Sequence, residues 1–137
     1  MTADAAFMRR ALELALRAGD EGEVPIGAIV VLDEKIVGEG WNRPIASRDP
    51  TAHAEIQALR AAAASVKNYR LSGATLYVTL EPCDMCLGAM FHARIGRCVH
   101  GAADPKKQVL KSQVKLEGGV MAGECGSILS EFFAVRR

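Results

Sequence analysis

The stretches His53-Ala54-Glu55 and Pro82-Cys83-Asp84-Met85-Cys86 supply one imidazole, two thiols and a carboxylate. A catalytic zinc ion takes three protein ligands and leaves the fourth tetrahedral position open for water, whereas a structural zinc ion normally recruits a fourth Cys or His. His53, Cys83 and Cys86 therefore predict a catalytic site that holds one Zn²⁺ per chain. Glu55 is expected to move protons to and from the zinc-activated water.

Both ligand groups fall where the sequence predicts a helix to begin. We expect one helix from Ala52 to about Asn68, with Thr51 as its N-cap, and a second from near Cys83 to about Ala93. The positive end of the second helix dipole would stabilise the two thiols as thiolates, the form that binds zinc. Two intervening residues let both thiols reach one ion from a single turn.

The rest of the chain alternates between helices and strands. The further predicted elements are helices at Ala3 to Gly19 and Ala122 to Arg137, and strands at Ile26 to Leu32, Lys35 to Gly40, Thr75 to Leu80, Cys98 to His100 and Gln113 to Leu116. The first two strands form a hairpin across Asp33-Glu34, and the segment from Trp41 to Pro50 is expected to be a loop. This order predicts an α/β fold in which residues 1–137 form one three-layer α/β/α domain around a mixed sheet of about five strands.

The composition excludes several classes of protein. The chain has 137 residues, is 50% hydrophobic and carries a formal net charge of +1, so any nucleic acid must be bound by a local basic patch. Its longest apolar stretch is too short to cross a membrane, and no secretory signal is apparent at the N-terminus. Four cysteines without such a signal indicate a reducing compartment, and we expect a cytoplasmic protein.

The His-x-Glu and Pro-Cys-x-x-Cys motifs resemble those of the zinc-dependent nucleoside and nucleobase deaminases. Further stretches resemble the bacterial tRNA-specific adenosine deaminases: Glu23 to Ala28, Gly40 to Pro44, Asp49 to Glu55, Leu76 to Cys86, Gly88 to Met90, Arg94 to Arg97, and Phe132-Phe133. This resemblance covers nearly the whole chain. It implies the cytidine deaminase-like fold, hydrolytic deamination of the wobble adenosine in a tRNA anticodon loop to inosine, and a homodimer that completes each active site.

The same resemblance assigns roles to residues around the metal. Glu55 would take a proton from the water and return protons to the ring nitrogen and the leaving amine. Asn42 would hydrogen-bond the target base or its ribose, although a turn residue is the alternative. Ala54 would offer its backbone N–H to the substrate. Val24 and Ile26 would form an apolar wall against the base, and Ile26 could equally be strand core.

Three more residues are predicted to contact the substrate. Asp104 precedes Pro105 in the loop after the fourth strand. Phe132 and Arg136 lie in the closing helix, where the resemblance implies that the aromatic pair and a basic residue reach the anticodon loop. The alternative for Arg136 is that cations favour the C-terminus of any helix.

The chain departs from the family after Asp104-Pro105-Lys106. The family usually continues with Thr-Gly-Ala-Ala-Gly-Ser and a longer connection, whereas here the connection reads Lys107 to Ser112 and is roughly a dozen residues short. The zinc chemistry is retained, but the substrate could instead be adenine or cytosine in single-stranded DNA, or a free nucleobase. A non-catalytic binding subunit is a further alternative, against which the retained Glu55 argues. The lysines of this region could meet phosphates: Lys106, Lys107, Lys111 and Lys115.

Overall fold

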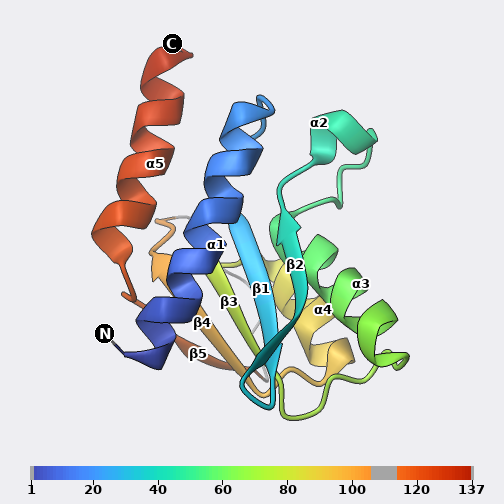
Figure 1. Cartoon of the computed structure of the whole chain (residues 1–137). Helices are drawn as coiled ribbons and strands as arrows, with labels where there is room; N and C mark the ends of the chain where they lie inside the picture. The colour runs from blue at the N-terminus through green and yellow to red at the C-terminus, as the bar shows by residue number, and fades with distance from the viewer. Residues whose placement is uncertain (1, 106–113, 137) are drawn as a thin grey trace.

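The computed structural model describes residues 2–105 and 114–136, which form five strands and five helices (Figure 1). The helices are α1 (Ala3–Asp20), α2 (Pro44–Ser47), α3 (Ala54–Val66), α4 (Asp84–Ala93) and α5 (Ala122–Val135). The strands are β1 (Gly27–Leu32), β2 (Lys35–Trp41), β3 (Thr75–Leu80), β4 (Arg97–Ala102) and β5 (Lys115–Glu117). The described helices include none that is long and apolar enough to cross a membrane.

The five strands form one mixed sheet in the order β2-β1-β3-β4-β5. Strand β1 runs antiparallel to both β2 and β3, while β3, β4 and β5 are parallel to one another. The predicted hairpin is confirmed, with Asp33 and Glu34 in the left-handed region at its turn. The mixed five-stranded sheet agrees with the sequence prediction.

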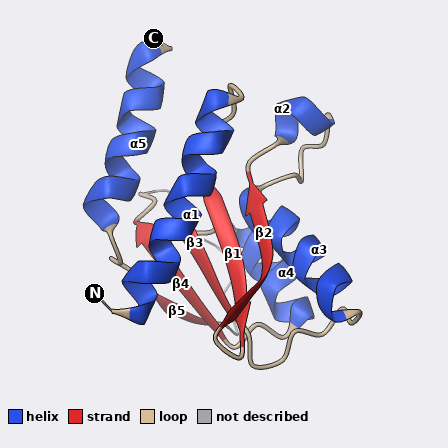
Figure 2. Cartoon of the chain, viewed as in Figure 1, coloured by secondary structure: helices blue, strands red, loops and turns tan. Residues whose placement is uncertain are grey.

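Helices cover both faces of this sheet (Figure 2). Helices α1 and α5 pack on one face, where Ile29, Tyr77 and Val99 point from successive strands into a core that also contains Met8 and Cys125. Helices α3 and α4 pack on the other. The buried residues of that second core include Ala58, Leu76, Val78, Met90 and Cys98. Because neighbours along a strand point to opposite faces, each strand contributes to both cores, and the three-layer α/β/α prediction is confirmed.

The strand directions gather the predicted site at one edge of the sheet. Strands β2, β3 and β4 all end at this edge, and β1 begins there because Gly27 pairs with Trp41. The chain entering β1 and the chain leaving β2, β3 and β4 are therefore neighbours. Helices α3 and α4 also start at this edge, so their first turns face the same space.

Two glycines of β2 allow α3 to lie directly on the sheet. A Cβ atom at Gly38 would lie 2.5 Å from the carbonyl oxygen of Ala58. At Gly40 it would lie 2.4 Å from the carbonyl oxygen of Ala54. Both distances are far below van der Waals contact with backbone atoms, so only glycine permits this approach.

The structure corrects two details of the sequence prediction. The N-cap of α3 is His53, not Thr51, because the Ala52 N–H is donated to the Asp49 carbonyl and the chain stays extended through His53 (φ −67°, ψ 155°). The expected loop from Trp41 to Pro50 contains the short helix α2, and Trp41 itself still belongs to β2. Smaller differences lie at helix and strand ends. Gln113 and the lysines at 106, 107 and 111, for which a strand end and a basic segment were predicted, fall outside the described residues.

Candidate active site

The three predicted metal ligands meet at the first turns of α3 and α4. His53 Nδ1 lies 3.6 Å from Cys83 Sγ and 3.5 Å from Cys86 Sγ, although 30 and 33 residues separate them in sequence. The three ligand atoms lie within 4.8 Å of one another, and they are the one such group found in the described part of the chain. His53 and Cys83 occupy the N-cap positions of the two helices, which keeps both backbones extended and brings both side chains to the same point.

These separations fit a tetrahedral zinc ion. Zinc–nitrogen bonds of about 2.0–2.1 Å and zinc–sulfur bonds of about 2.3 Å, held at the tetrahedral angle, place N and S about 3.6 Å apart. The two nitrogen–sulfur distances agree with that value. One imidazole and two thiols leave one tetrahedral position without a protein ligand, which is the composition of a catalytic rather than a structural zinc site.

The two thiols have unlike environments. The pKa of Cys83 is lowered to about 4, first by the hydrogen bond from Cys86 and then by the one from His53. The pKa of Cys86 is raised, because its thiol donates to Cys83 and because it is buried. Cys83 is thus a thiolate at neutral pH. A divalent cation would replace the proton that the two sulfur atoms share, since metal binding releases protons from its ligands.

Glu55 is buried beside the ligands. It is 4% exposed, and this burial is the main cause that raises its pKa to about 7. A carboxyl group whose pKa lies near neutrality can both accept and return a proton at physiological pH. A cation bound by the adjacent ligands would stabilise the carboxylate and lower this pKa again.

Asn42 holds the start of the ligand helix. Its side-chain Oδ1 accepts the backbone N–H of Ala54 at 3.0 Å, and both residues are buried. One unpaired donor of the first turn of α3 is satisfied in this way. The Ala54 N–H that was predicted to meet the substrate is therefore engaged with Asn42 in this structure, and the Asn42 amide group remains a candidate donor toward the substrate.

Two cavities open onto the ligand cluster. The larger, of about 460 Å³, is lined by Val24, Ile26, Asn42, His53, Leu80, Asp104, Leu129 and Phe133. The smaller, of about 190 Å³, is lined by Ile26, His53, Glu55, Leu80, Glu81, Cys83 and Asp104. Ile26, His53, Leu80 and Asp104 line both cavities, so Glu55 and Cys83 are reached from the wider space. Apolar walls with a few polar groups are typical of a small-molecule or base-binding site.

The structure brings most of the predicted substrate residues to this space. Val24, Ile26, Asn42 and Asp104 line the larger cavity. Phe132 does not, since it lines a separate pocket with Leu16 and Pro25. Arg136 stacks on Phe132, with its guanidinium carbon 3.6 Å from the ring centroid, and lines neither cavity at the ligand cluster.

Three cavity residues, Leu80, Glu81 and Leu129, were given no role by the sequence, and Phe133 was expected at the anticodon loop only as part of the aromatic pair. Phe133 and Leu129 are four positions apart and so share one face of α5, whereas Phe132 shares the adjacent face with Ile128. The sequence spacing therefore predicts that Phe132 and Phe133 lie on different faces of α5, but it does not predict which face borders the cavity.

The other two residues follow from the end of β3. Leu80 is the last residue of this strand. Glu81 accepts the backbone N–H of Asp104 at 3.0 Å and so fixes the loop after β4.

Comparisons with known proteins agree with this geometry. Residues 1–102 match the family model of the cytidine and deoxycytidylate deaminase zinc-binding region. The chain is 50% identical over 147 residues to the tRNA-specific adenosine deaminase of Haemophilus influenzae (98% of this chain, 85% of that protein). It is 49% identical over 145 residues to that of Buchnera aphidicola subsp. Schizaphis graminum (98% and 96%). A solved structure from a study of A-to-I editing by tRNA:A34 deaminases at the wobble position of transfer RNA is 40% identical. It gives a TM-score of 0.86 and covers 90% of this chain and 99% of that one.

A three-layer α/β/α fold with a His/Cys/Cys cluster and a buried glutamate at one sheet edge defines a zinc-dependent deaminase. Within that class, the chain belongs to the family of tRNA-specific adenosine deaminases. The alignment with the Haemophilus influenzae protein runs over 147 positions although this chain has 137 residues, so that relative carries residues within the matched region that are missing here. This agrees with the short connection seen in the sequence.

Proposed function

We propose that the protein hydrolyses adenosine to inosine at the wobble position of a tRNA anticodon loop and releases ammonia. The observation that carries this proposal is the ligand cluster and Glu55 beneath a cavity of about 460 Å³, in a chain half of whose aligned residues are identical to a tRNA-specific adenosine deaminase. The identity favours this substrate over cytosine, single-stranded DNA or a free nucleobase. A cytoplasmic location is part of the proposal, because thiol ligands must stay reduced to bind metal.

The reaction adds water to C6 of adenine and expels the amine. His53, Cys83 and Cys86 would hold a zinc ion, whose chemistry when bound is Lewis-acid activation of a water molecule. Glu55 takes a proton from the attacking water, delivers one to the ring nitrogen N1 and transfers one to the departing amine. Its buried position excludes bulk water from these transfers. The same burial raises its pKa, which favours proton uptake, while the bound cation lowers that pKa and favours proton release, so one carboxyl group serves as both base and acid.

The cavity walls orient the base for this attack. Val24 and Ile26 contact one side of the ring, Asn42 donates its amide N–H to the base or ribose, and Asp104 contributes a carboxylate at the rim. Phe133 closes the opposite side from α5. Phe132 and Arg136 stay in the proposal as contacts to the flanking loop nucleotides, on the neighbouring face of the same helix.

Product analysis tests the activity. The purified protein is incubated with an RNA anticodon stem-loop carrying adenosine at the wobble position, and the digested product is analysed for inosine by mass spectrometry. The same loop with cytidine at that position, its DNA version and free adenosine serve as matched substrates. We expect inosine from the RNA adenosine substrate at a rate at least tenfold above the others. Formation of uridine from the cytidine loop would show that the protein deaminates cytidine. Faster reaction of the DNA loop would show that DNA is the preferred substrate, and either result would contradict the proposal.

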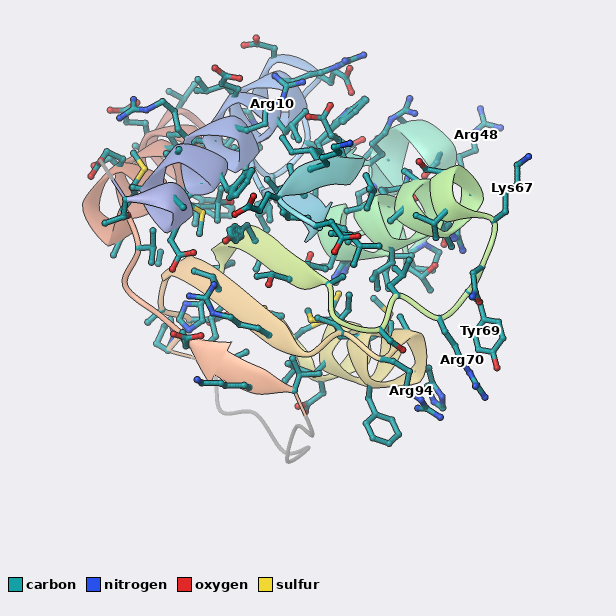
Figure 3. The ribbon with its side chains drawn as sticks, turned by 60° about the horizontal axis from the view of Figure 1, so that its bottom comes forward. Arg10, Arg48, Lys67, Tyr69, Arg70 and Arg94 are labelled. Carbon is teal, nitrogen blue, oxygen red and sulfur yellow. The ribbon has the colours of Figure 1, made fainter. Side chains whose placement is uncertain are left out.

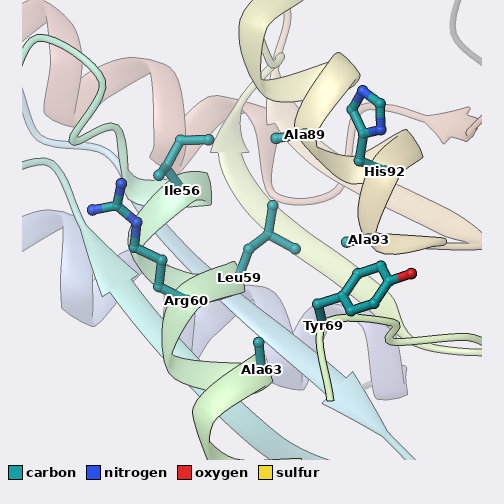
Figure 4. Close-up of a pocket in the computed structure, with 8 residues that line it drawn as sticks. All are labelled: Ile56, Leu59, Arg60, Ala63, Tyr69, Ala89, His92 and Ala93. Atoms are coloured by element: carbon teal, nitrogen blue, oxygen red, sulfur yellow. The ribbon is translucent and has the colours of Figure 1, made fainter. Parts of the chain in front are cut away.

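The proposal includes a homodimer that pairs through the outer faces of α3 and α4. An apolar groove of about 300 Å³ runs between these helices (Figure 4). Its lining residues are Ile56, Leu59, Arg60, Ala63, Tyr69, Ala89, His92 and Ala93. Light scattering would measure the oligomeric state. Ala89→Arg is expected to produce a monomer, while Ala64→Arg, on an exposed part of α3 outside the groove, stays dimeric.

A further inference from the structure

We propose that three cations at the C-terminal ends of α3 and α4 bind the phosphodiester backbone of the nucleic-acid substrate, away from the target base. This inference rests on the proposed function. The basic cluster consists of Lys67, Arg70 and Arg94, accompanied by the rings of Tyr69 and Phe91. Because Tyr69 also lines the groove between α3 and α4, the cluster lies at the rim of the surface proposed for the partner subunit. Lys67, Tyr69, Arg70 and Arg94 project along one edge of the molecule (Figure 3).

The cluster differs in its charge balance from the arginines that form ion pairs, although Arg9, Arg48 and Arg136 also form none with the described residues. Five arginines pair with carboxylates: Arg10, Arg17, Arg43, Arg60 and Arg97. Lys67, Arg70 and Arg94 form no ion pair with any described residue, and all three are exposed. Their charge is therefore available to phosphate groups, in a chain whose overall net charge is only +1.

A backbone contact joins the two arginines. The N–H of Leu71 donates to the carbonyl of Ala93 at 2.7 Å. Arg70 directly precedes Leu71 and Arg94 directly follows Ala93, so the two arginines lie side by side. Asn68 Oδ1 accepts the N–H of Arg70 at 3.0 Å and fixes the turn that presents it. The spacing of these positive charges is set by the fold and not by loose side chains alone.

Each arginine stacks on an aromatic neighbour. The Arg70 guanidinium carbon lies 5.5 Å from the Tyr69 ring centroid, and Arg70 Nε donates to the Tyr69 hydroxyl at 3.1 Å. The Arg94 guanidinium carbon also lies 5.5 Å from the Phe91 ring, and Arg94 Nη1 donates to the Phe91 carbonyl at 3.1 Å. These contacts orient the guanidinium groups without neutralising them. Interleaved cations and aromatic rings are the composition of nucleic-acid surfaces.

The distance between the basic cluster and the metal ligands indicates which part of the RNA the cluster contacts. Metal ligands stand at the N-terminal ends of α3 and α4, and the cluster stands at their C-terminal ends. The 13 residues of α3 span about 20 Å, or about six nucleotide steps of a strand. The cluster therefore contacts the stem, not the loop that holds the target. Helix-dipole stabilisation accounts for the caps Lys67 and Arg94 but not for Arg70, which follows the helix.

The double variant Arg70→Gln/Arg94→Gln tests this assignment. Its matched control is Arg9→Gln/Lys35→Gln, which removes two exposed cations that also have no ion pair with any described residue. Fluorescence anisotropy measures binding of an RNA stem-loop and of the loop oligonucleotide alone, between about 50 and 200 mM salt. Zinc content and melting temperature are measured in parallel.

For Arg70→Gln/Arg94→Gln, we expect stem-loop affinity to fall at least about tenfold at about 50 mM salt, and the slope of log K against log salt to fall by about 1.5–2. Affinity for the loop alone, zinc content and melting temperature stay at wild-type values. Unchanged stem-loop affinity, an equal loss in the control, or an equal loss for the loop alone would overturn the assignment. If the wild type makes no inosine in the stem-loop, the proposed function fails instead, and that result is separate from the binding data.

Discussion

The side-chain oxygen of Asn42 accepts the backbone N–H of Ala54 at 3.0 Å, and through this bond the end of β2 holds the first turn of the helix that carries His53 and Glu55. Asn42 is 7% exposed and Ala54 is fully buried. The contact links a cavity-lining side chain to the backbone between His53 and Glu55. Asn42 thus connects the wall of the cavity to the geometry of the ligand cluster.

Asn42→Ala removes this acceptor and leaves a buried N–H unpaired. We expect a loss of about 1 kcal/mol in the free energy of unfolding, and a lower kcat because the first turn of α3 is less firmly held. Asn42→Asp keeps the acceptor and should retain the melting temperature, yet lose kcat/KM for want of an amide donor. Equal melting temperatures for the wild type and Asn42→Ala would show that the bond does not hold the helix.

Glu55→Gln keeps the shape of the side chain but cannot carry protons. Turnover should fall about 10²–10⁴-fold while zinc content, measured by atomic emission, stays at one ion per chain. His53→Ala should lose both zinc and turnover, because it removes a ligand. If Glu55→Gln retained wild-type turnover, another group would have to be the proton carrier.

Gly40→Ala would place a Cβ atom 2.4 Å from the carbonyl oxygen of Ala54 and force α3 away from the sheet. We expect the free energy of unfolding to fall by about 1–3 kcal/mol, with weaker zinc retention against a chelator, since the ligand helix moves. Gly126→Ala is the control, because a Cβ there meets nothing within 4 Å. It should be neutral or stabilise by up to about 1 kcal/mol.

Phe133→Ala and Phe132→Ala separate the two faces of α5. Phe133 lines the cavity at the metal cluster and Phe132 lines a different pocket. Steady-state kinetics with a short loop substrate should therefore give a KM about tenfold higher for Phe133→Ala, from loss of about 1–3 kcal/mol of ring contact with the base, and a smaller change for Phe132→Ala. The reverse order would place the substrate on the other face of the helix.

Acid stability should depend on Asp4. The pKa of Asp4 is lowered, first by its hydrogen bonds from Arg97, which join the start of α1 to β4. A depressed folded-state pKa contributes stability above the unfolded value of about 3.9 that is lost as pH falls through the folded value. Urea midpoints for the wild type and Asp4→Asn should thus differ at pH 6 and converge toward pH 2. Asp33→Asn, in the exposed hairpin turn, should track the wild type throughout.

Much of the fold and site can be read from local patterns. Cys83 and Cys86 are one turn apart, and Glu55 is two residues from His53, so their joint chemistry depends on few torsion angles. The alternation of strands and helices likewise follows from neighbouring residues, and it predicted the three layers and the mixed sheet. The N-cap of α3 was wrong by two residues because Asp49 binds Thr51 and Ala52 in a turn before the helix begins.

Contacts between residues far apart in the sequence could not be predicted from such local patterns. His53 approaches two sulfur atoms that are 30 and 33 positions away, and burial raises the pKa of Glu55. These features, and the placement of Phe133 rather than Phe132 in the cavity wall, depend on the register of β1, β2 and β3 and on where α5 crosses the sheet. The sequence alone thus established the chemistry of the site, because ligand type and spacing are local properties of short motifs. The tertiary structure was needed to establish the shape of the cavity, because long-range packing brings together the segments that enclose it.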